Sequence, residues 1–342
     1  MQHIDLQLSS YDYQLPIEQI ALRPMENRAD SRLLVYKKKT GEIFHKSFYD
    51  LPDLLPKDSL LVLNNSKVFP CRLTGKKPTG GAVEVFVLSL SQKENAYPCL
   101  LKSSGRKKVG DIIELPLKVK AEIVSKLDGS FLLKFDTDLP RYLDKVAAIP
   151  LPPYIRNGIS DEKDDITYQT VYAKDIGSVA APTAGLHFNK DVFSKLEVKG
   201  IQTAFVTLHV GQGTFLPVKD ENILDHHMHI ENYSIEKNDW KKINRHPKIF
   251  AVGTTSLRVL ESIKQSEKEF FPEKAYETDI FLHPGKKIQS IEGMITNFHL
   301  PKSSLIMLVS TLIGREKTME LYELAIKEGY RFYSYGDAML IL

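Results

Sequence analysis

The stretch over residues 178–218 most constrains the fold, because it surrounds single histidines with residues that have little side chain. In its second half, the apolar-rich run 204–210 ends in the turn Gly211-Gln212-Gly213. A strand that ends in such a turn is typical of ligand-binding edges in α/β proteins, and small residues let a ligand approach the main chain closely. Tight turns around buried, hydrogen-bonded histidines are the alternative interpretation.

A second glycine turn favours the same fold class. The apolar run 249–252 is followed by Gly253, and Thr254 or Thr255 is a natural N-cap for a helix over 257–268. Free N–H groups at such a helix start suit an anion or a polar nucleoside edge. Strands that alternate with helices in this way predict a large α/β domain.

The pattern changes between about residues 66 and 148. Short apolar-rich runs follow one another there with almost no helical period, separated by Gly, Asn, Asp or Lys. This spacing predicts a small antiparallel barrel or sandwich. Three prolines within residues 149–156 mark its end. We therefore expect a discontinuous large domain, residues 1–65 and 149–342, with residues 66–148 inserted as an antiparallel β-barrel.

Two groups of basic residues can each be interpreted in two ways. The turns 75–77 and 103–108 of the inserted domain are rich in lysine, and either are solvated or contact nucleic-acid phosphates. Arg23, Arg28 and Arg32 lie in an irregular segment with prolines. That segment is either a rigid loop that faces an anion or a surface stretch with solvated arginines.

Composition excludes several classes of protein. The chain has 342 residues, 42% of them hydrophobic and 26% charged, as in an ordinary globular protein of more than one domain. A net charge of +3 is compatible with RNA but too low for binding by charge alone. No apolar run reaches the roughly 18 residues of a membrane helix, and we expect no signal peptide. Cys71 and Cys99 lack CxxC spacing, so we expect a cytoplasmic enzyme.

Residues 225–231 concentrate three histidines and a carboxylate. In a strand, His227, His229 and Glu231 would share a face, whereas in a helical turn His226 and His229 would. A metal site is one interpretation. Because the spacing matches no established zinc motif, a polar substrate-binding cluster is favoured and no metal is expected.

Short motifs run through the chain in a fixed order. Among them are Ser31-Arg32-Leu33-Leu34-Val35, Pro150-Leu151-Pro152-Pro153-Tyr154-Ile155, Ala180-Ala181-Pro182-Thr183-Ala184-Gly185-Leu186-His187-Phe188, His209-Val210-Gly211, Gly253-Thr254-Thr255-Ser256, Thr278-Asp279-Ile280-Phe281, Thr296-Asn297-Phe298-His299-Leu300-Pro301 and Tyr333-Ser334-Tyr335-Gly336-Asp337-Ala338. Together they resemble, over essentially the whole chain, the S-adenosylmethionine:tRNA ribosyltransferase-isomerase family of queuosine biosynthesis.

The resemblance implies a defined reaction. The ribosyl part of S-adenosylmethionine is transferred to the aminomethyl group of 7-aminomethyl-7-deazaguanine at the wobble position of a tRNA anticodon. The ribose is isomerised to an epoxycyclopentanediol, which gives epoxyqueuosine, while adenine and methionine leave. The resemblance also implies S-adenosylmethionine as the ribosyl donor, no metal, a monomer, and a distorted, barrel-like α/β domain with the inserted β-barrel.

The reaction calls for groups that titrate near neutrality. The sulfonium acidifies the carbon bonded to it, so a base must remove a proton there, and an acid must assist the departure of adenine. Eight of the ten histidines lie between His187 and His299. With the resemblance, the catalytic candidates are His187, His209, His226, His229, Glu231, Asp279, His299 and Asp337. The substrate-binding candidates are Arg28, Arg32, Asn64, Asn65, Pro182, Thr183, Gly185, Gly211, Gly213, Thr214, Thr254, Thr255, Ser256, Arg258, Thr278, Asn297 and Tyr335.

We expect the loops 180–187, 209–214 and 253–256 to converge on one cleft that binds S-adenosylmethionine, because strand ends cluster on one side of a sheet. Two other classes compete with this hypothesis. A metal-dependent hydrolase would use the cluster 226–231. A non-catalytic RNA-binding module would present a broader basic surface than a net charge of +3 allows.

Overall fold

The computed structural model describes residues 3–77, 79–211, 213 and 218–342, and it divides into two compact units. The first unit consists of the chain up to Ser66, Thr170–Asp175 and Ala181–Leu342. The second consists of Lys67–Gln169 and Ile176–Ala180. This second unit extends beyond the insertion expected over residues 66–148.

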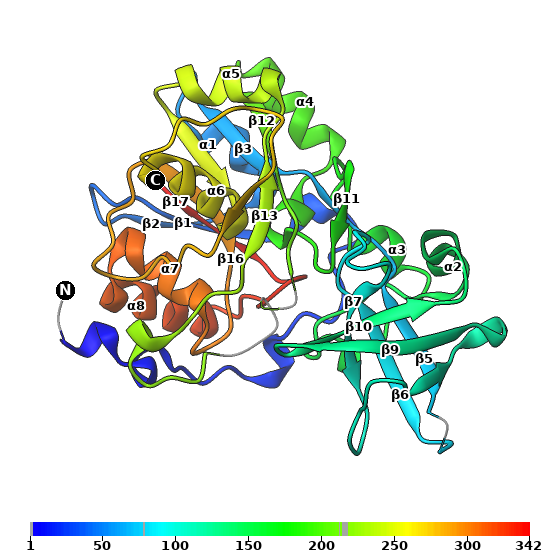
Figure 1. Ribbon diagram of the computed structural model, residues 1–342. Helices are drawn as coiled ribbons and strands as arrows, with labels where there is room; N and C mark the ends of the chain where they lie inside the picture. The colour runs from blue at the N-terminus through cyan, green and yellow to red at the C-terminus, as the bar shows by residue number, and fades with distance from the viewer. Residues whose placement is uncertain (1–2, 78, 212, 214–217) are drawn as a thin grey trace. The chain divides into compact units, whose positions relative to one another are not determined.

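Within the described residues, the first unit is built on a nine-stranded sheet. In the order in which they lie side by side, its strands are β15 (Tyr276–Thr278), β13 (Glu231–Ser234), β12 (Gln202–Leu208), β3 (Leu60–Asn64), β14 (Ile249–Val252), β16 (Gly293–Asn297), β17 (Ala338–Ile341), β1 (Arg32–Tyr36) and β2 (Ile43–Ser47). Strands β12, β3, β14 and β16 are mutually parallel, and the last strand, β17, pairs with the first, β1 (Figure 1).

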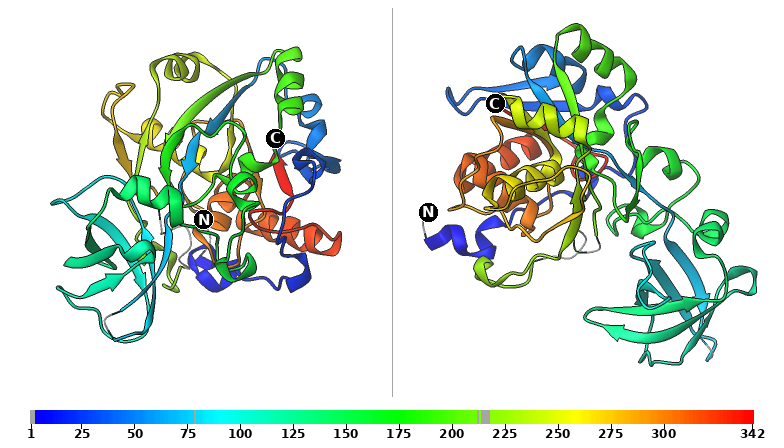
Figure 2. Two further views of the ribbon diagram at one scale, coloured as in Figure 1. Left: turned by 90° about the vertical axis from the view of Figure 1, so that its right-hand side faces the viewer. Right: turned by 45° about the horizontal axis from the view of Figure 1, so that its top comes forward.

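Helices cover both faces of this sheet. They are α1 (Leu51–Leu54), α4 (Lys190–Val198), α5 (Lys237–Arg245), α6 (Gly253–Gln265), α7 (Ser304–Ile313) and α8 (Arg315–Lys327). Every residue of β3, β14, β16 and β17 is buried, as expected for strands with both faces covered. Helix α4 lies beside α1 although the two are far apart in sequence (Figure 2), and Phe188, Val192 and Leu196 pack there against the sheet.

The second unit contains a closed antiparallel barrel. Its strand order is β10 (Ser130–Phe135), β7 (Tyr97–Lys102), β6 (Ala82–Val87), β5 (Arg72–Lys76), β8 (Ile112–Glu114) and β9 (Lys120–Leu127). In β6, the buried Val83, Val85 and Val87 alternate with more exposed residues, which is the period of a strand with one face in a core. The unit also contains α2 (Leu139–Val146) and α3 (Asp164–Thr167). A short two-stranded sheet joins β4 (Ser66–Val68) to β11 (Asp175–Ser178). The predicted α/β fold class with an antiparallel barrel is confirmed.

Two local predictions are wrong. Thr254 and Thr255 are not N-caps, because α6 already begins at Gly253, whose φ of +85° lets the chain turn directly out of β14. Residues 226–230 form neither a strand nor a helical turn, and regular structure resumes only at Glu231 in β13.

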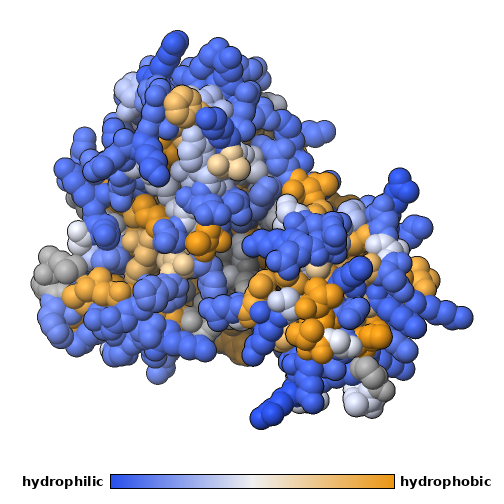
Figure 3. Space-filling model, viewed as in Figure 1, coloured by the Kyte–Doolittle hydropathy of each residue, from blue (hydrophilic) through white to orange (hydrophobic). Residues whose placement is uncertain are grey.

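Hydrophilic side chains predominate on the face shown in Figure 3, and apolar side chains form smaller groups among them. Among the described residues, no helix is long and apolar enough to cross a membrane.

Candidate active site

Many of the predicted site residues lie at one edge of the nine-stranded sheet, the edge formed by the carboxyl ends of its parallel strands. The register sets Asn64 beside Val206 and Leu63 beside Val252, so the carboxyl ends of β3, β12 and β14 lie together. The antiparallel strands β13 and β17 begin at this same edge, and Glu231 is the first residue of β13. In α/β sheets the loops that follow carboxyl ends are the usual ligand-binding positions.

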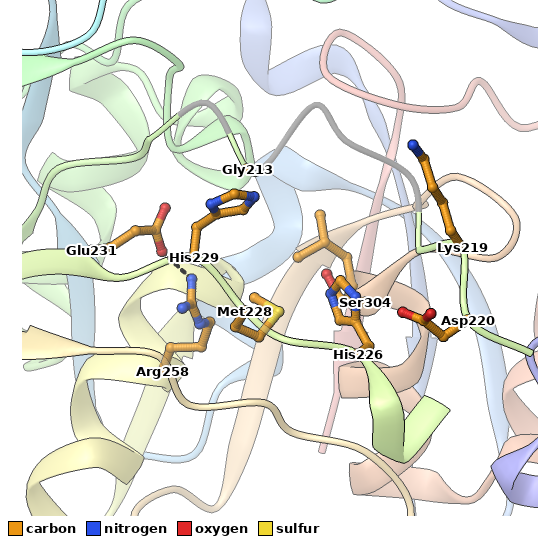
Figure 4. A pocket seen from close by; sticks show the side chains of 10 residues that line it. Gly213, Lys219, Asp220, His226, Met228, His229, Glu231, Arg258 and Ser304 are labelled. Carbon is orange, nitrogen blue, oxygen red and sulfur yellow. Dashed lines mark hydrogen bonds and ion pairs between the residues drawn. The ribbon is translucent and has the colours of Figure 1, made fainter. Parts of the chain in front are cut away.

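A pocket of about 250 Å³ opens on the β12–β13 side of this edge. Figure 4 shows Glu231, His229 and Arg258 on one side of it and Lys219 and Asp220 on the other. Its lining residues are Gly213, Lys219, Asp220, His226, Met228, His229, Glu231, Arg258, Ser304 and Leu305.

Glu231 and Arg258 form a buried ion pair in this pocket, with side chains 5% and 6% exposed. Nη1 of Arg258 donates to Oε2 of Glu231, while Oε1 accepts from the main-chain N–H of Gly211 at 3.0 Å. Nε of Arg258 donates to the main-chain oxygen of Ile280 at 3.3 Å. Within the described part of the chain, Nη2 of Arg258 is buried without a hydrogen-bond partner. Because an unpaired buried donor is costly, this atom suits an oxygen of a ligand.

His226 and His229 line the same pocket but differ in environment. His226 is half-buried, and its ring meets that of Phe281 edge-on at 5.4 Å. Burial lowers the pKa of His226, and the charge of Asp220 partly opposes this. His229 is exposed. Both rings are therefore accessible from the pocket for hydrogen bonding or proton transfer.

His209 follows β12 and belongs to a polar network that sequence analysis did not identify. Its Nδ1 lies 3.1 Å from Oγ of Ser66. Burial lowers the pKa of His209, and the carboxylate of Asp175 partly opposes this. That carboxylate accepts from Nδ2 of Asn65 and from the hydroxyl of Thr207, each at 3.0 Å. Among the described residues, Nε2 of His209 has no hydrogen-bond partner.

Asn64 holds the strand ends in place. Its side chain is buried and bonds both main-chain groups of Leu208, donating to the oxygen at 2.9 Å and accepting from the N–H at 3.1 Å. It also donates to Oγ1 of Thr255 at 3.3 Å. Asn64 and Asn65 thus order the edge of the sheet through protein contacts.

The first main-chain N–H groups of α6 lie at this edge of the sheet without a side-chain cap among the described residues. Oγ of Ser256 bonds back to the main-chain oxygen of Val252 at 2.8 Å. Thr254 is buried, and Thr255 is partly exposed. The first N–H groups of an uncapped helix suit an anion.

His187 occupies a different part of the same edge, stacked on Phe48 at 5.0 Å. Nδ2 of Asn297 donates both to the main-chain oxygen of Tyr333 and to Nε2 of His187, each at 3.1 Å. Since a main-chain oxygen only accepts, this amide orientation makes Nε2 the acceptor and Nδ1 the donor to Oγ of Ser31, 2.8 Å away. Both ring nitrogens are therefore bonded to protein.

Burial lowers the pKa of His187 to about 3, and the charges of Arg331 and Arg28 act in the same direction. His299 is similar, because burial lowers its pKa to about 3 and its Nε2 lies 2.7 Å from Oγ1 of Thr296. Both rings are neutral at pH 7.

Asp337, the carboxylate in the apolar C-terminal tail, bonds to main chain. Its two oxygens accept from the N–H groups of Arg32 and Arg331 at 2.9 and 2.8 Å. The side chain of Arg32 donates to the main-chain oxygen of Glu328 and lies over the ring of Tyr330 at 3.8 Å. Asp337 and Arg32 thus join β1 to the C-terminal segment.

The glycines of the central stretch differ in the space beside them. A Cβ at Gly185 would lie 1.9 Å from Oη of Tyr172, so this position is filled by the protein itself. A Cβ at Gly213 would lie 2.4 Å from the ring of His229. At Gly211 the nearest atom would be Cγ of Glu231, 4.0 Å away. Gly211 alone of the three leaves room for a larger group.

The other predicted residues lie apart from this pocket or outside the described residues. Arg28 and Tyr335 line a cavity of about 10 Å³ with His187, and burial lowers the pKa of Arg28. Thr278 bonds Oγ of Ser262 at 2.5 Å, and Asp279 is exposed. Pro182 is buried and Thr183 partly exposed, and Thr214 lies outside the described residues.

Sequence analysis missed several residues that the structure brings to the site. They are the pocket residues Lys219, Asp220, Met228, Ser304 and Leu305, and the His209 partners Ser66 and Asp175. A polar Lys-Asp pair shortly after the glycine turn was the one available sequence signal. No three His, Cys, Asp or Glu side chains of the described ranges are grouped so that they could hold a metal ion.

Comparisons with known proteins agree with this architecture. Residues 8–341 match the model of a family described as queuosine biosynthesis protein. A protein of Carboxydothermus hydrogenoformans and one of Acetivibrio thermocellus, both named S-adenosylmethionine:tRNA ribosyltransferase-isomerase, are each 45% identical to this chain and cover 98% of it and 100% of themselves. The crystal structure of S-adenosylmethionine tRNA ribosyltransferase from Thermotoga maritima is similar with a TM-score of 0.55 and 32% identity, over 97% of this chain and 100% of that one. The chain belongs to the queuosine biosynthesis protein family.

Proposed function

We propose that this protein is an S-adenosylmethionine:tRNA ribosyltransferase-isomerase. It transfers and isomerises the ribose moiety of S-adenosylmethionine onto the aminomethyl group of 7-aminomethyl-7-deazaguanine in tRNA, which gives epoxyqueuosine-tRNA and releases adenine and methionine. The observation that carries the proposal is the full-length 45% identity with relatives that bear this name. The pocket with a buried, incompletely bonded arginine supports it.

The pocket suits one part of S-adenosylmethionine. Drug-sized ligands occupy sites of roughly 300–1,000 Å³, so about 250 Å³ accommodates a portion of this substrate. Nη2 of Arg258 donates to a substrate oxygen there. Because Glu231 already balances the charge of Arg258, a ribose hydroxyl suits this donor. The uncapped start of α6 faces the methionine carboxylate.

His209 is the proposed general base that removes the proton next to the sulfonium. Its lowered pKa keeps it neutral at pH 7, and Ser66 holds its Nδ1 so that Nε2 is available. His229 is the proposed acid that assists the departure of adenine, and His226, whose pKa burial lowers, is a proposed hydrogen-bond partner of the substrate. His187, His299 and Asp337 position the strand ends, since their polar atoms bond to protein.

We propose that the inserted barrel spans residues 66–148 and that residues 1–65 and 149–342 form the catalytic domain. We also propose that the protein is a cytoplasmic monomer and needs no metal.

Incubation with S-adenosylmethionine and tRNA carrying the deazaguanine base, followed by nucleoside mass analysis, tests the function. The expected product is epoxyqueuosine, and its absence would overturn the proposal. A metal-dependent reaction at His226 and His229 is the competing hypothesis. Loss of turnover after EDTA treatment, restored by zinc alone, would favour it.

A further inference from the structure

The inserted barrel is the basic part of this protein. Residues 66–148 contain 15 Lys and Arg against 9 Asp and Glu, a net charge of +6. Since the whole chain has a net charge of +3, the remaining residues carry −3. A charge asymmetry of this kind indicates a polyanionic partner for the barrel.

The structure brings the two lysine-rich turns of the barrel together. Nζ of Lys77, in the β5–β6 turn, donates to the main-chain oxygen of Ser104, in the β7–β8 connection. Nζ of Lys107 donates to the oxygen of Ser103 at 3.3 Å. These turns are separate in sequence, so their cations form one surface only in the folded barrel. We name this surface the basic end; its cations are Lys76, Lys77, Lys102, Arg106, Lys107 and Lys108.

Few carboxylates oppose this charge. Residues 102–110 contain four cations and no Asp or Glu. Glu84 is the register partner of Lys102, but its carboxylate pairs with Arg72. Lys102 instead lies over the ring of Phe86, with Nζ 4.8 Å from the ring centroid. The basic end is therefore left largely uncompensated.

Two carboxylates flank the basic end at its margin. Asp111 accepts from the main-chain N–H of Lys108 at 2.9 Å, and Glu114 stands in register between Lys76 and Lys120. The side chains of Lys76, Arg106 and Lys108 are exposed. They are thus available to an anionic partner.

We propose that the basic end binds phosphates of the tRNA substrate. This inference rests on the proposed function, which supplies tRNA as the polyanion. Contacts from lysine and arginine to phosphates position an RNA without reading its sequence, and each contact adds to the salt dependence of binding. The barrel thus supplies affinity for the tRNA, and the modified base is recognised elsewhere.

The test compares two triple variants of the full chain that remove the same charge. Lys76→Gln, Arg106→Gln and Lys108→Gln alter the basic end, and Lys39→Gln, Lys57→Gln and Lys268→Gln alter exposed lysines of the first unit. The affinity for unmodified tRNA is measured at several salt concentrations. The basic-end variant should bind about tenfold or more weakly, with a salt slope reduced by roughly 2–3, whereas the control variant should bind like wild type.

Equal affinity and slope in the basic-end variant and the wild type would overturn the inference, as would an equal loss in the control variant. Should the triple variant misfold, the single changes Arg106→Gln and Lys108→Gln should each lower the slope by roughly one. Binding of S-adenosylmethionine should be unchanged throughout. A wild type that forms no epoxyqueuosine would contradict the proposed function, and the salt slopes would still decide on the basic end.

Discussion

Two regions at the carboxyl ends of the sheet strands contain histidines, one around His187 and one in the pocket. They differ in how far their side chains are hydrogen-bonded to protein. Around His187, both ring nitrogens are bonded to protein and the ring is stacked on Phe48, although Oδ1 of the neighbouring Asn297 is buried without a partner among the described residues. In the pocket, His226 and His229 are accessible, and among the described residues Nη2 of Arg258 has no partner. Histidines with bonded nitrogens stabilise the edge, whereas incompletely bonded groups are available for substrate. The chemistry is therefore expected on the β12–β13 side.

Substitution of Arg258 should give the largest effect. Arg258→Ala leaves the buried carboxylate of Glu231 without its partner, which should lower the free energy of unfolding by about 3–5 kcal/mol, as measured by urea denaturation. The double variant Glu231→Gln with Arg258→Met removes both charges. It should recover stability but not turnover. Full turnover in this double variant would show that the pair serves stability alone and would remove the contrast between the two regions.

His209 and His187 give the next test. His209→Ala should lower single-turnover rates about 100-fold or more, since a general base contributes at least that factor. Turnover of the wild type should fall as pH decreases through the lowered pKa of His209, because the base must be neutral. His187→Ala should instead lower stability and change the turnover of the folded fraction less. The reverse order of effects would move the chemistry to the His187 region.

Substitutions at Gly185 and Gly211 should distinguish an effect on packing from an effect on substrate binding. Gly185→Ala places a Cβ 1.9 Å from Oη of Tyr172, so it should lower the free energy of unfolding by roughly 1–3 kcal/mol. Gly211→Ala meets no described atom closer than 4.0 Å and should change stability little. Gly211→Leu should weaken S-adenosylmethionine binding, as measured by calorimetry. Unaltered affinity in Gly211→Leu would exclude this loop from the substrate site.

The strands and glycine turns at this edge could be predicted from the sequence because the residues that specify them are neighbours in the chain. The strand before Gly253 and the run before Gly211 each precede their turns directly, and they became β14 and β12. The partners of the histidines are not local. Ser31 and Asn297 lie 156 and 110 positions from His187, and neither contact leaves a sequence pattern. The bonded state of His187, which decides between catalysis and support, therefore required the structure.

The role of Asp175, the carboxylate near His209, could not be predicted from the sequence for the same reason. Asp175 reaches the site through Asn65, 110 positions away, and Thr207, 32 positions away. Its own segment contains no glycine turn after an apolar run, so nothing marked it as a site residue. Conversely, Asp337 was marked by its apolar neighbours, and its partners proved to be the main-chain N–H groups of Arg32 and Arg331 and the guanidinium of Arg331.

The smallest expected effect concerns the two buried histidines. His187 and His299 have a pKa of about 3 in the folded protein, against an ordinary value of 6.5. Well above pH 6.5 neither the folded nor the unfolded state binds these protons, so the full stability is present. As pH falls from 6.5 towards 3, only the unfolded state is protonated, and stability is lost by about 0.7 kcal/mol per histidine between pH 7 and pH 6.

His299→Gln removes one of these titrations and keeps a polar side chain near Thr296. The decrease in the free energy of unfolding between pH 7 and pH 6 should therefore be about 0.7 kcal/mol smaller in this variant than in the wild type, whatever its absolute stability. Urea denaturation at the two pH values measures the difference. An identical decrease in both proteins would mean that His299 takes up its proton in the folded state over the same pH range as in the unfolded state. Such a charge beside Thr296 would make this region as available for proton transfer as the pocket, and the distinction between the two regions would fail.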